Sequence, residues 1–396
     1  MNTSVNGSRS RPLCFYSAVG SRLSVYHLDP QTGRLALRGG ADMPAKVQYA
    51  WRHPSLPVLY VGTSSAGPRQ ASLENHVSAW SIAADGSLQP LGQSQILPAR
   101  PVHICVHPSG PFLLSGHNFG GGNLTVHALN PDGSIGAAVA QHEVQDFGIY
   151  PHQVMTLPGG DYALIVDRGN SPKDERPEDP GALRTYRMTD GQLGAGQVVA
   201  PNEGYGFGPR HVAFHPSGRW LYVSDERFNC LHVFALDGSL IDPQPLQTLS
   251  TLRDPGNAKQ RQLAGPIHVH PNGRAVYVAN RADGVIEQQG RQVFGGGENN
   301  IAVFEIDPTS GKVAPVQHAD TESFHVRTFS MDGDARVLVA ASVKPMATEA
   351  GPVAASLTVF RMDGVLLQQL HREEVATPGT ELQYWTGLGT VCTEPT

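Results

Sequence analysis

Chemically active side chains stand at both ends of one short segment of this sequence. Residues 208–226 read GPRHVAFHPSGRWLYVSDE, with two apolar runs on either side of a His-Pro-Ser-Gly turn. Pro presets φ and Gly tolerates positive φ, so the segment is typical of a β-hairpin. Because a hairpin brings its outer ends together, we expect Arg210 and Glu226 to lie side by side. A guanidinium beside a carboxylate could bind an anion or take part in acid–base chemistry, or it could be an ion pair that braces the hairpin.

The same hairpin recurs along the chain about every 55 residues, and internal repeats of this length are a strong fold signal. After each copy comes a further strand, a polar turn and one more strand, as in HVSAWSIAADGSLQPL (76–91). Four antiparallel strands per repeat at this spacing indicate a β-propeller. The further copies of the hairpin are found at 50–63, 101–118, 151–169, 265–281 and 325–342.

The two ends of the chain complete the predicted ring. Six full repeats lie between about 44 and 370, while residues 13–37 supply only three outer strands and residues 381–391 one spare strand. Because a propeller hides its sheet edges by closing, we predict that the spare strand completes the first blade. The prediction is an all-β, seven-bladed propeller over 13–396 after a flexible N-terminus at 1–12; a two-domain β-sandwich is the alternative.

Hairpin geometry gathers polar residues on one face of this disc. Residues that open an inner strand and residues that close the second strand share one face, and the His-Pro-x-Gly turns lie on the other. Convergent polar groups around an axis are typical of a small-ligand site, whereas the turn histidines His53, His107, His215 and His270 are predicted to be structural. The polar set is Lys46, His103, His152, Arg210, His268 and Arg327 at the openings, and Thr63, Asn118, Asp167, Glu226 and Arg281 at the closings.

With the repeat established, several motifs resemble the lactonase family of seven-bladed propellers, which includes 6-phosphogluconolactonases of the propeller type and the fungal carboxy-cis,cis-muconate cyclase. The resemblance covers essentially the whole chain and implies a catalytic set of one His, two Arg and one Glu. On this sequence the set falls on His152, Arg210, Glu226 and Arg281, with Arg327 as a competing choice for the second Arg. The motifs are PHQV (151–154), GPRHVAFHPSGRWLYVSDE (208–226), HPNGRAVYVANR (270–281), ENNIAVFEID (298–307) and HNFGGGNLTVHAL (117–129).

Lactone chemistry then suggests a role for each residue. Ring opening needs a base-activated water and stabilisation of the oxyanion. We expect His152 or Glu226 to be the general base and acid, and Arg210 and Arg281 to hold the oxyanion and any carboxylate or phosphate of the substrate. The remaining candidates for substrate binding are His103, Asn118, Asp167, His211 and Arg327, although His103 and His211 could simply cap strands.

Three functions remain open from the sequence. The first is hydrolysis of an anionic lactone, phosphorylated or carboxylated, such as 6-phosphogluconolactone. The second is a muconate-type lactonising cycloisomerase, which would run a related reaction in the opposite direction. The third is a non-catalytic, ligand-binding propeller; the complete His/Arg/Glu set favours an enzyme. Three insertions on the site face, 64–76, 168–182 and 282–298, are expected to tune specificity.

Composition limits partners and compartment. The net charge of −6 and the pI near 6.3 argue against nucleic acid and an anionic membrane, and no apolar run could span a bilayer. The four cysteines fit no zinc or redox motif, so we interpret them as buried or incidental thiols of a cytoplasmic protein. No cofactor is expected. No catalytic metal is expected either, because each closely spaced histidine pair (His103/His107, His211/His215 and His268/His270) places one member at a turn on the opposite face. We expect a monomer or homodimer.

Overall fold

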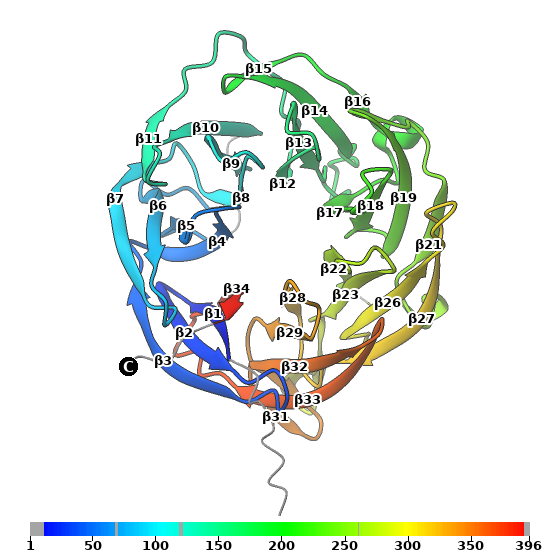
Figure 1. Ribbon diagram of the computed structural model, residues 1–396. Coiled ribbons are helices and arrows are strands. Elements are labelled where there is room, and N and C mark those ends of the chain that lie inside the picture. The colour runs from blue at the N-terminus through cyan, green and yellow to red at the C-terminus, as the bar shows by residue number, and fades with distance from the viewer. Residues whose placement is uncertain (1–11, 68–69, 119–121, 260, 392–396) are drawn as a thin grey trace, which may run out of the picture.

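The chain forms a ring of seven four-stranded blades around a central axis, in a computed structural model that describes residues 12–67, 70–118, 122–259 and 261–391 (Figure 1). The predicted seven-bladed propeller is therefore confirmed. The predicted flexible segment 1–12 lies outside the described residues except for Pro12. Among the described residues, the helices are two short 3₁₀ turns, η1 (Pro201–Gly204) and η2 (Pro255–Asn257), and no helix is long and apolar enough to cross a membrane.

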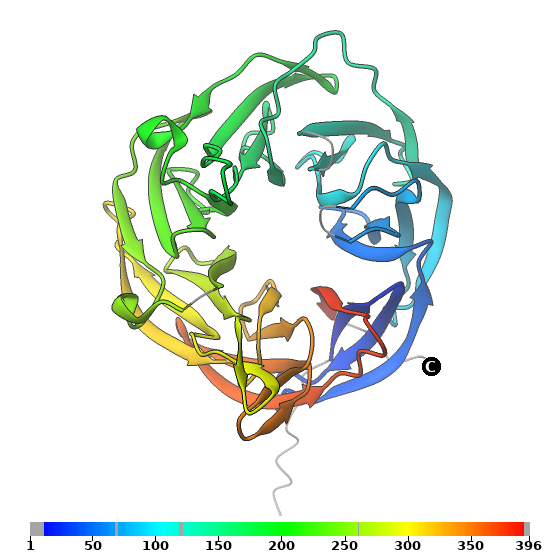
Figure 2. The same cartoon turned by 180° about the vertical axis from the view of Figure 1, so that it is seen from behind.

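The first blade joins both ends of the chain. Strand β34 (Gln383–Val391) is its innermost strand and pairs antiparallel with β1 (Leu13–Val19), so the last strand in the sequence lies beside the first (Figures 1 and 2). The other two strands are β2 (Arg22–Leu28) and β3 (Leu35–Asp42). The predicted closure by the spare strand is thus confirmed, because β34 gives the first blade the fourth strand that the N-terminal segment lacks.

Blades two to four follow in chain order, each with its first strand nearest the axis. Their strands are β4 (Lys46–Arg52), β5 (Val58–Ser64), β6 (Asn75–Ile82) and β7 (Leu88–Ile96); β8 (Pro101–Val106), β9 (Phe112–His117), β10 (Asn123–Leu129) and β11 (Ile135–Ala138); and β12 (Pro151–Thr156), β13 (Tyr162–Asp167), β14 (Ala182–Thr189), β15 (Gln192–Gly194) and β16 (Val198–Val199).

Blades five to seven have the same order, with two extra hairpins inserted after second strands. Their strands are β17 (Pro209–Phe214), β18 (Trp220–Asp225), β19 (Cys230–Asp237), β20 (Leu240–Ile241) and β21 (Gln247–Ser250); β22 (Gln262–Val269), β23 (Ala275–Ala282), β26 (Asn300–Ile306) and β27 (Val313–Asp320); and β28 (Val326–Met331), β29 (Val337–Ser342), β32 (Ser356–Asp363) and β33 (Leu366–Glu374). The hairpins are β24 (Val285–Gln288) with β25 (Arg291–Phe294), and β30 (Met346–Thr348) with β31 (Gly351–Val353).

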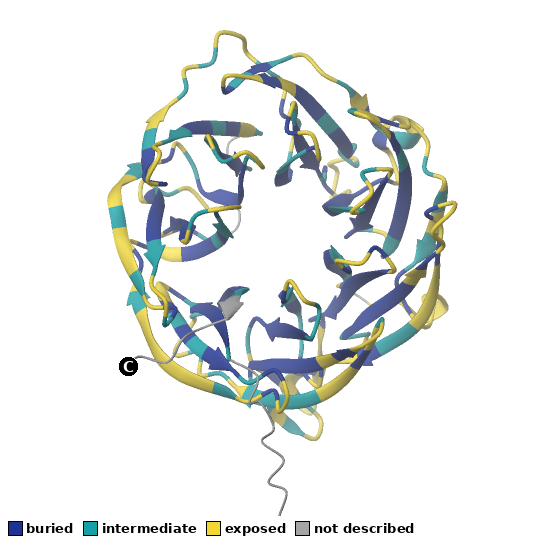
Figure 3. Cartoon of the chain, viewed as in Figure 1, coloured by how far each residue is buried: buried dark blue, intermediate teal, exposed yellow. Residues whose placement is uncertain are grey.

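Apolar side chains fill the spaces between blades, so the second strands are buried on both faces while the outermost strands are largely exposed (Figure 3). Hydrogen bonds from histidine side chains link neighbouring blades at the turns. His107 Nε2 donates to the Gly160 carbonyl and His215 Nε2 to the Gly273 carbonyl, each at 2.9 Å. The Nδ1 of His215 accepts the Ser217 N–H at 3.1 Å. These contacts give the turn histidines the structural role expected of them.

One interpretation of the cysteines is wrong. Cys105 is a buried free thiol, but Cys14 is disulfide-bonded. The spacing of cysteines along the chain does not reveal this, because ring closure places β1, which carries Cys14, beside the last strand of the chain. Cys392 lies outside the described residues.

Each inner strand carries the same irregularity where it enters the ring. In five blades the register with the second strand slips by one residue; for example, Pro209 faces Asp225 while His211 faces Ser224. The residue in between is a β-bulge, which re-aims side chains and is often found next to functional sites. The bulge residues are Gln48, Val102, His152, Arg210 and Arg327, with Tyr384 at the equivalent place in β34 and Gly265–Pro266 in β22.

Candidate active site

A cavity of about 1230 Å³ opens where the inner strands begin, on the face opposite the His-Pro-x-Gly turns. Three kinds of residue make up most of its lining: bulge residues, residues at or directly after the ends of second strands, and the long connections of blades four to six. The bulge residues are Val102, His152, Arg327 and Tyr384; the residues after second strands are Arg168 and Glu226, joined by Arg281 near the end of β23; and the connections add Ser171, Pro172, Lys173, Arg176, Ala258, Lys259 and Arg261.

A single carboxylate at the base of this cavity holds three guanidinium groups. Glu226 Oε1 accepts from Arg168 Nη1 at 2.6 Å, and Glu226 Oε2 lies 2.8 Å from Arg210 Nε. Arg281 Nη2 also bonds Oε2. Glu226 is 5% exposed and Arg210 only 1%. Burial would raise the pKa of Glu226, but Arg281, Arg168 and Arg210 outweigh it and hold that pKa well below its usual range.

Three histidines occupy the layer below and beside this cluster. The ring of His211 packs against His152 at 5.1 Å and against His103 at 5.6 Å between centroids. Its Nδ1 accepts a hydrogen bond from Arg210 Nη1 at 3.1 Å, which requires that nitrogen to be unprotonated. Burial, and then the charge of Arg210, hold the pKa of all three imidazoles well below the ordinary value, so they are neutral at physiological pH.

His325 fixes the third guanidinium from the opposite side. Arg281 Nη1 lies 3.1 Å from His325 Nε2, and His325 Nδ1 lies 3.6 Å from a carboxylate oxygen of Asp283. The backbone of His325 has φ of 57°, a conformation uncommon for a residue with a side chain. Its N–H is held by Asn299 Oδ1 at 2.8 Å. Arg281 is therefore clamped between Glu226 and His325.

The sequence-predicted catalytic residues come together. His152, Glu226 and Arg281 line the cavity, and Arg210 lies directly beneath it on Glu226. The competing choice, Arg327, also lines the cavity, but it contacts the Tyr384 ring at 3.8 Å and has no ion pair with Glu226.

The predicted substrate-binding residues are more scattered. His103 is fully buried and stacks on Tyr49 at 3.9 Å, and Asn118 does not line the cavity. Asp167 is also fully buried; it accepts the N–H groups of Ile149 and Tyr150 at 3.2 and 2.8 Å and pairs with Arg184 at 3.3 Å. The carboxylate of Asp167 is thus used within the protein.

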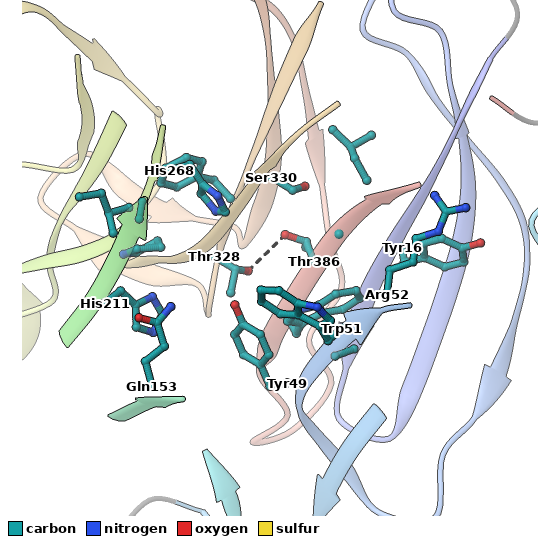
Figure 4. A pocket seen from close by; sticks show the side chains of 18 of the residues that line it. Tyr16, Tyr49, Trp51, Arg52, Gln153, His211, His268, Thr328, Ser330 and Thr386 are labelled. Atoms are coloured by element: carbon teal, nitrogen blue, oxygen red, sulfur yellow. Dashed lines mark hydrogen bonds between the residues drawn. The ribbon is translucent and has the colours of Figure 1, made fainter. Parts of the chain in front are cut away.

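His211 lies at the edge of a second cavity, of about 430 Å³, around the same axis (Figure 4). Gln153 stands beside it, and Tyr49, Trp51 and Thr328 lie across the space. Two layers of side chains therefore surround the axis. Bulge residues such as His152 and Arg210 serve the cationic cavity, and the residues that follow them serve the second one.

Sequence reasoning did not choose several polar residues of the cationic cavity as site residues, among them Arg100, Arg168, His325 and Tyr384. Arg168 could have been found. Asp167 pairs with Pro151 as Asp225 pairs with Pro209, so Arg168 occupies the position of Glu226. Aligning Asp167-Arg168 with Asp225-Glu226 on their Asp residues reveals this equivalence.

No group of three His, Cys, Asp or Glu side chains in the described part of the chain is placed to hold a metal ion. What the arrangement offers is cationic. Nine Arg and Lys side chains line the cavity among its described residues, against the one carboxylate of Glu226. Such a surface binds anions, and its neutral histidines can accept protons.

Comparisons with known proteins agree with this geometry. The family model "Lactonase, 7-bladed beta-propeller" matches residues 13–346. A 6-phosphogluconolactonase of Cronobacter sakazakii is 30% identical over 335 residues, which are 83% of this chain and 86% of that protein. One from Bacillus subtilis is 28% identical over 299 residues, 72% and 76% of the two chains. A periplasmic gluconolactonase of Pseudomonas aeruginosa has the same fold, with a TM-score of 0.71 at 21% identity over 93% of this chain and 98% of that one. The chain belongs to the lactonase family of seven-bladed β-propellers.

Proposed function

We propose that this protein hydrolyses the ring ester of an anionic sugar lactone. The observation that carries the proposal is the charge of the cavity. Arg168, Arg210 and Arg281 share one carboxylate, so the cluster keeps a net positive charge in a buried site. Buried uncompensated charge is costly, and an anionic ligand would relieve it. Similarity to 6-phosphogluconolactonases supports the same substrate class.

The reaction follows from the groups that line the cavity. A water molecule attacks the lactone carbonyl carbon while His152 accepts its proton. The carbonyl oxygen becomes an oxyanion, which Arg168 or Arg281 stabilises with a charge-assisted hydrogen bond. The bond from the carbonyl carbon to the ring oxygen then breaks, and protonated His152 returns its proton to that oxygen. The product is an open-chain hydroxy acid.

Glu226 is better suited to hold the arginines than to act as the base. Both of its oxygens are engaged by guanidinium groups, and those charges hold its pKa far below neutrality. A carboxylate in that state is a weak proton acceptor. His152 is neutral and lines the cavity, and the negative charge of a bound substrate would offset the guanidinium charges that lower its basicity. We therefore assign proton transfer to His152 and positioning of Arg281 and Arg210 to Glu226.

A panel of lactones tests the proposal. The panel contains 6-phosphogluconolactone, a carboxylated muconolactone and the uncharged glucono-1,5-lactone, each assayed with and without a chelator and corrected for spontaneous hydrolysis. We expect faster hydrolysis of an anionic lactone than of the neutral one, unchanged by the chelator. Conversion of the muconolactone to an open, unsaturated diacid of the same composition, without uptake of water, would indicate the cycloisomerase. No turnover of any lactone would contradict the proposal.

A further inference from the structure

Part of the cationic cavity carries positive charge that Glu226 does not neutralise. Arg100 directly precedes β8 in blade three, and Arg327 is the bulge residue of β28 in blade seven. Both line the cavity, and neither has a carboxylate partner among the described residues. The three guanidiniums on Glu226 come from blades four to six. Arg100 and Arg327 therefore belong to the other half of the ring.

Tyr384 connects these two arginines. Its hydroxyl lies 2.9 Å from Arg100 Nη2, and the Arg327 guanidinium lies over its ring at 3.8 Å. On its other side Arg100 Nε donates to Gln48 Oε1 at 2.6 Å. All of these partners are neutral. They fix the orientation of the guanidiniums without cancelling their charge, which is how a binding site is preorganised.

The burial of Arg100 makes this arrangement unusual. Arg100 is 3% exposed, and charged side chains are almost never buried to that degree unless they are paired. Burial lowers the pKa of Arg100, and the nearby charge of Arg327 lowers it further. The same two cations lower the pKa of Tyr384, against the effect of its own burial. The group that would complete this cluster is an anion.

We propose that Arg100, Tyr384 and Arg327 form a subsite for the phosphate monoester of the substrate, across the axis from the reacting carbonyl. Two uncompensated guanidiniums match the charge of a phosphate monoester, which is close to −2 at neutral pH, better than that of one carboxylate. The Tyr384 hydroxyl can donate to the same group, since its oxygen accepts from Arg100. This inference rests on the proposed lactonase function, which would place the lactone ring near Glu226 and His152.

Inorganic phosphate is the first probe, because its binding does not depend on turnover. Titration calorimetry compares the wild type with Arg327→Gln, Arg100→Gln and Tyr384→Phe, with Lys259→Gln as the matched control. Lys259 is an exposed cation on the rim of the same cavity, so its loss removes one charge without touching the subsite. Charge-assisted hydrogen bonds are worth enough that losing either arginine should weaken binding by about 10- to 100-fold. The control should change it by less than about threefold.

Kinetics give a second, separate readout. With 6-phosphogluconolactone, Arg100→Gln and Arg327→Gln should raise KM much more than they lower kcat. With uncharged glucono-1,5-lactone, both should lower kcat/KM much less than with 6-phosphogluconolactone, because the uncharged substrate has no group for the subsite. Arg327 is half-buried and its variant is expected to fold even if the Arg100 variant does not, as circular dichroism will show.

The outcomes separate the two proposals. Equal weakening of phosphate binding by Lys259→Gln and Arg327→Gln would overturn the subsite. It would show that phosphate responds to the overall positive charge of the cavity and not to specific contacts with the subsite residues. Equal losses on the charged and uncharged lactones, or tighter binding of a carboxylated than a phosphorylated substrate, would overturn the subsite as well. If phosphate binding is lost in the arginine variants while the wild type hydrolyses no lactone, the subsite stands and the lactonase function fails.

Discussion

Replacing Glu226 with glutamine removes the one carboxylate among the described residues that line the cationic cavity. In the wild type its two oxygens bond Arg168, Arg210 and Arg281. A glutamine has the same size but only one acceptor oxygen. Its NH₂ group would place N–H donors against the N–H donors of a guanidinium. At least one of the three guanidiniums would then lose its acceptor, and all three would lose the neutralising charge. Arg210 suffers most, because it is 1% exposed and cannot reach water.

The size of the effect follows from burial. Breaking a buried ion pair by removing one partner typically costs about 3–5 kcal/mol. The entropy of unfolding is about 2.1 cal/mol/K per residue, so a chain of 396 residues loses roughly 1.2 °C of Tm per kcal/mol, or about 4–6 °C here. The lowered pKa of Glu226 means that its stabilising effect is fully present above the unfolded-state pKa, about 4.3, and is lost as pH falls below it. The measurement therefore belongs at pH 7.5.

Scanning calorimetry and a lactonase assay check the prediction together. Glu226→Gln should lower Tm by the amount above and lower kcat/KM by at least about 100-fold, since the oxyanion donors lose their alignment. Added phosphate should raise the Tm of the variant by more than it raises the Tm of the wild type, because phosphate can replace the missing negative charge. The control is Asp42→Asn, which breaks the exposed pair with Arg22 and should cost less than about 1 kcal/mol. A Glu226→Gln protein with wild-type Tm and turnover would refute the reasoning.

Two predictions concern histidines. Burial and Arg210 hold the pKa of His152 well below 6.5, so kcat/KM should show no acid limb near pH 6.5, and His152→Asn should lower kcat more than KM; an acid limb at pH 6.5 would argue against His152 as the base. Burial lowers the pKa of His268 to about 4 in the folded protein, whereas an unfolded histidine titrates near 6.5. The free energy of unfolding is therefore unaffected by this residue above pH 6.5 and falls as the pH drops toward 4, by about 2 kcal/mol at pH 5. The Tm of His268→Gln should therefore fall less between pH 7 and pH 5 than that of the wild type, whereas Tm of a variant at exposed His142 should follow the wild type.

The fold could be predicted from the sequence because every blade of a propeller repeats the same pattern of strands and turns. Each hairpin carries the same turn and the same apolar alternation, so one clear copy at 208–226 identifies its weaker relatives. Ring closure followed from the same logic, since 13–37 lacked an inner strand and 381–391 had no other partner; β34 beside β1 confirms it. The disulfide of Cys14, a fact about spatial neighbours, escaped this reasoning.

The site was harder to predict because it depends on single-residue register. The closing positions were taken as the residues at which each second strand ends, which placed Asp167 and Glu226 in the same set. The strand pairing instead matches Asp167 with Asp225, and both of these Asp residues accept N–H groups of the chain that enters the inner strand. Arg100 and Tyr384 were missed for another reason. One lies just before a strand, and the other lies on the strand that was recognised only as the closing piece.

The bulge explains why adjacent residues can serve the same axis. In a regular strand, successive side chains point to opposite faces, so Arg210 and His211 could not touch. In β17, Arg210 is the extra residue opposite the Asp225–Ser224 step, and Arg210 Nη1 reaches His211 Nδ1 at 3.1 Å. The bulge therefore turns Arg210 toward Glu226 while His211 keeps its place in the layer below. Because the same slip occurs at His152 and Arg327, the inner strands deliver two rings of side chains to the axis, and the upper ring can change its chemistry without altering the hydrogen bonds of the sheet.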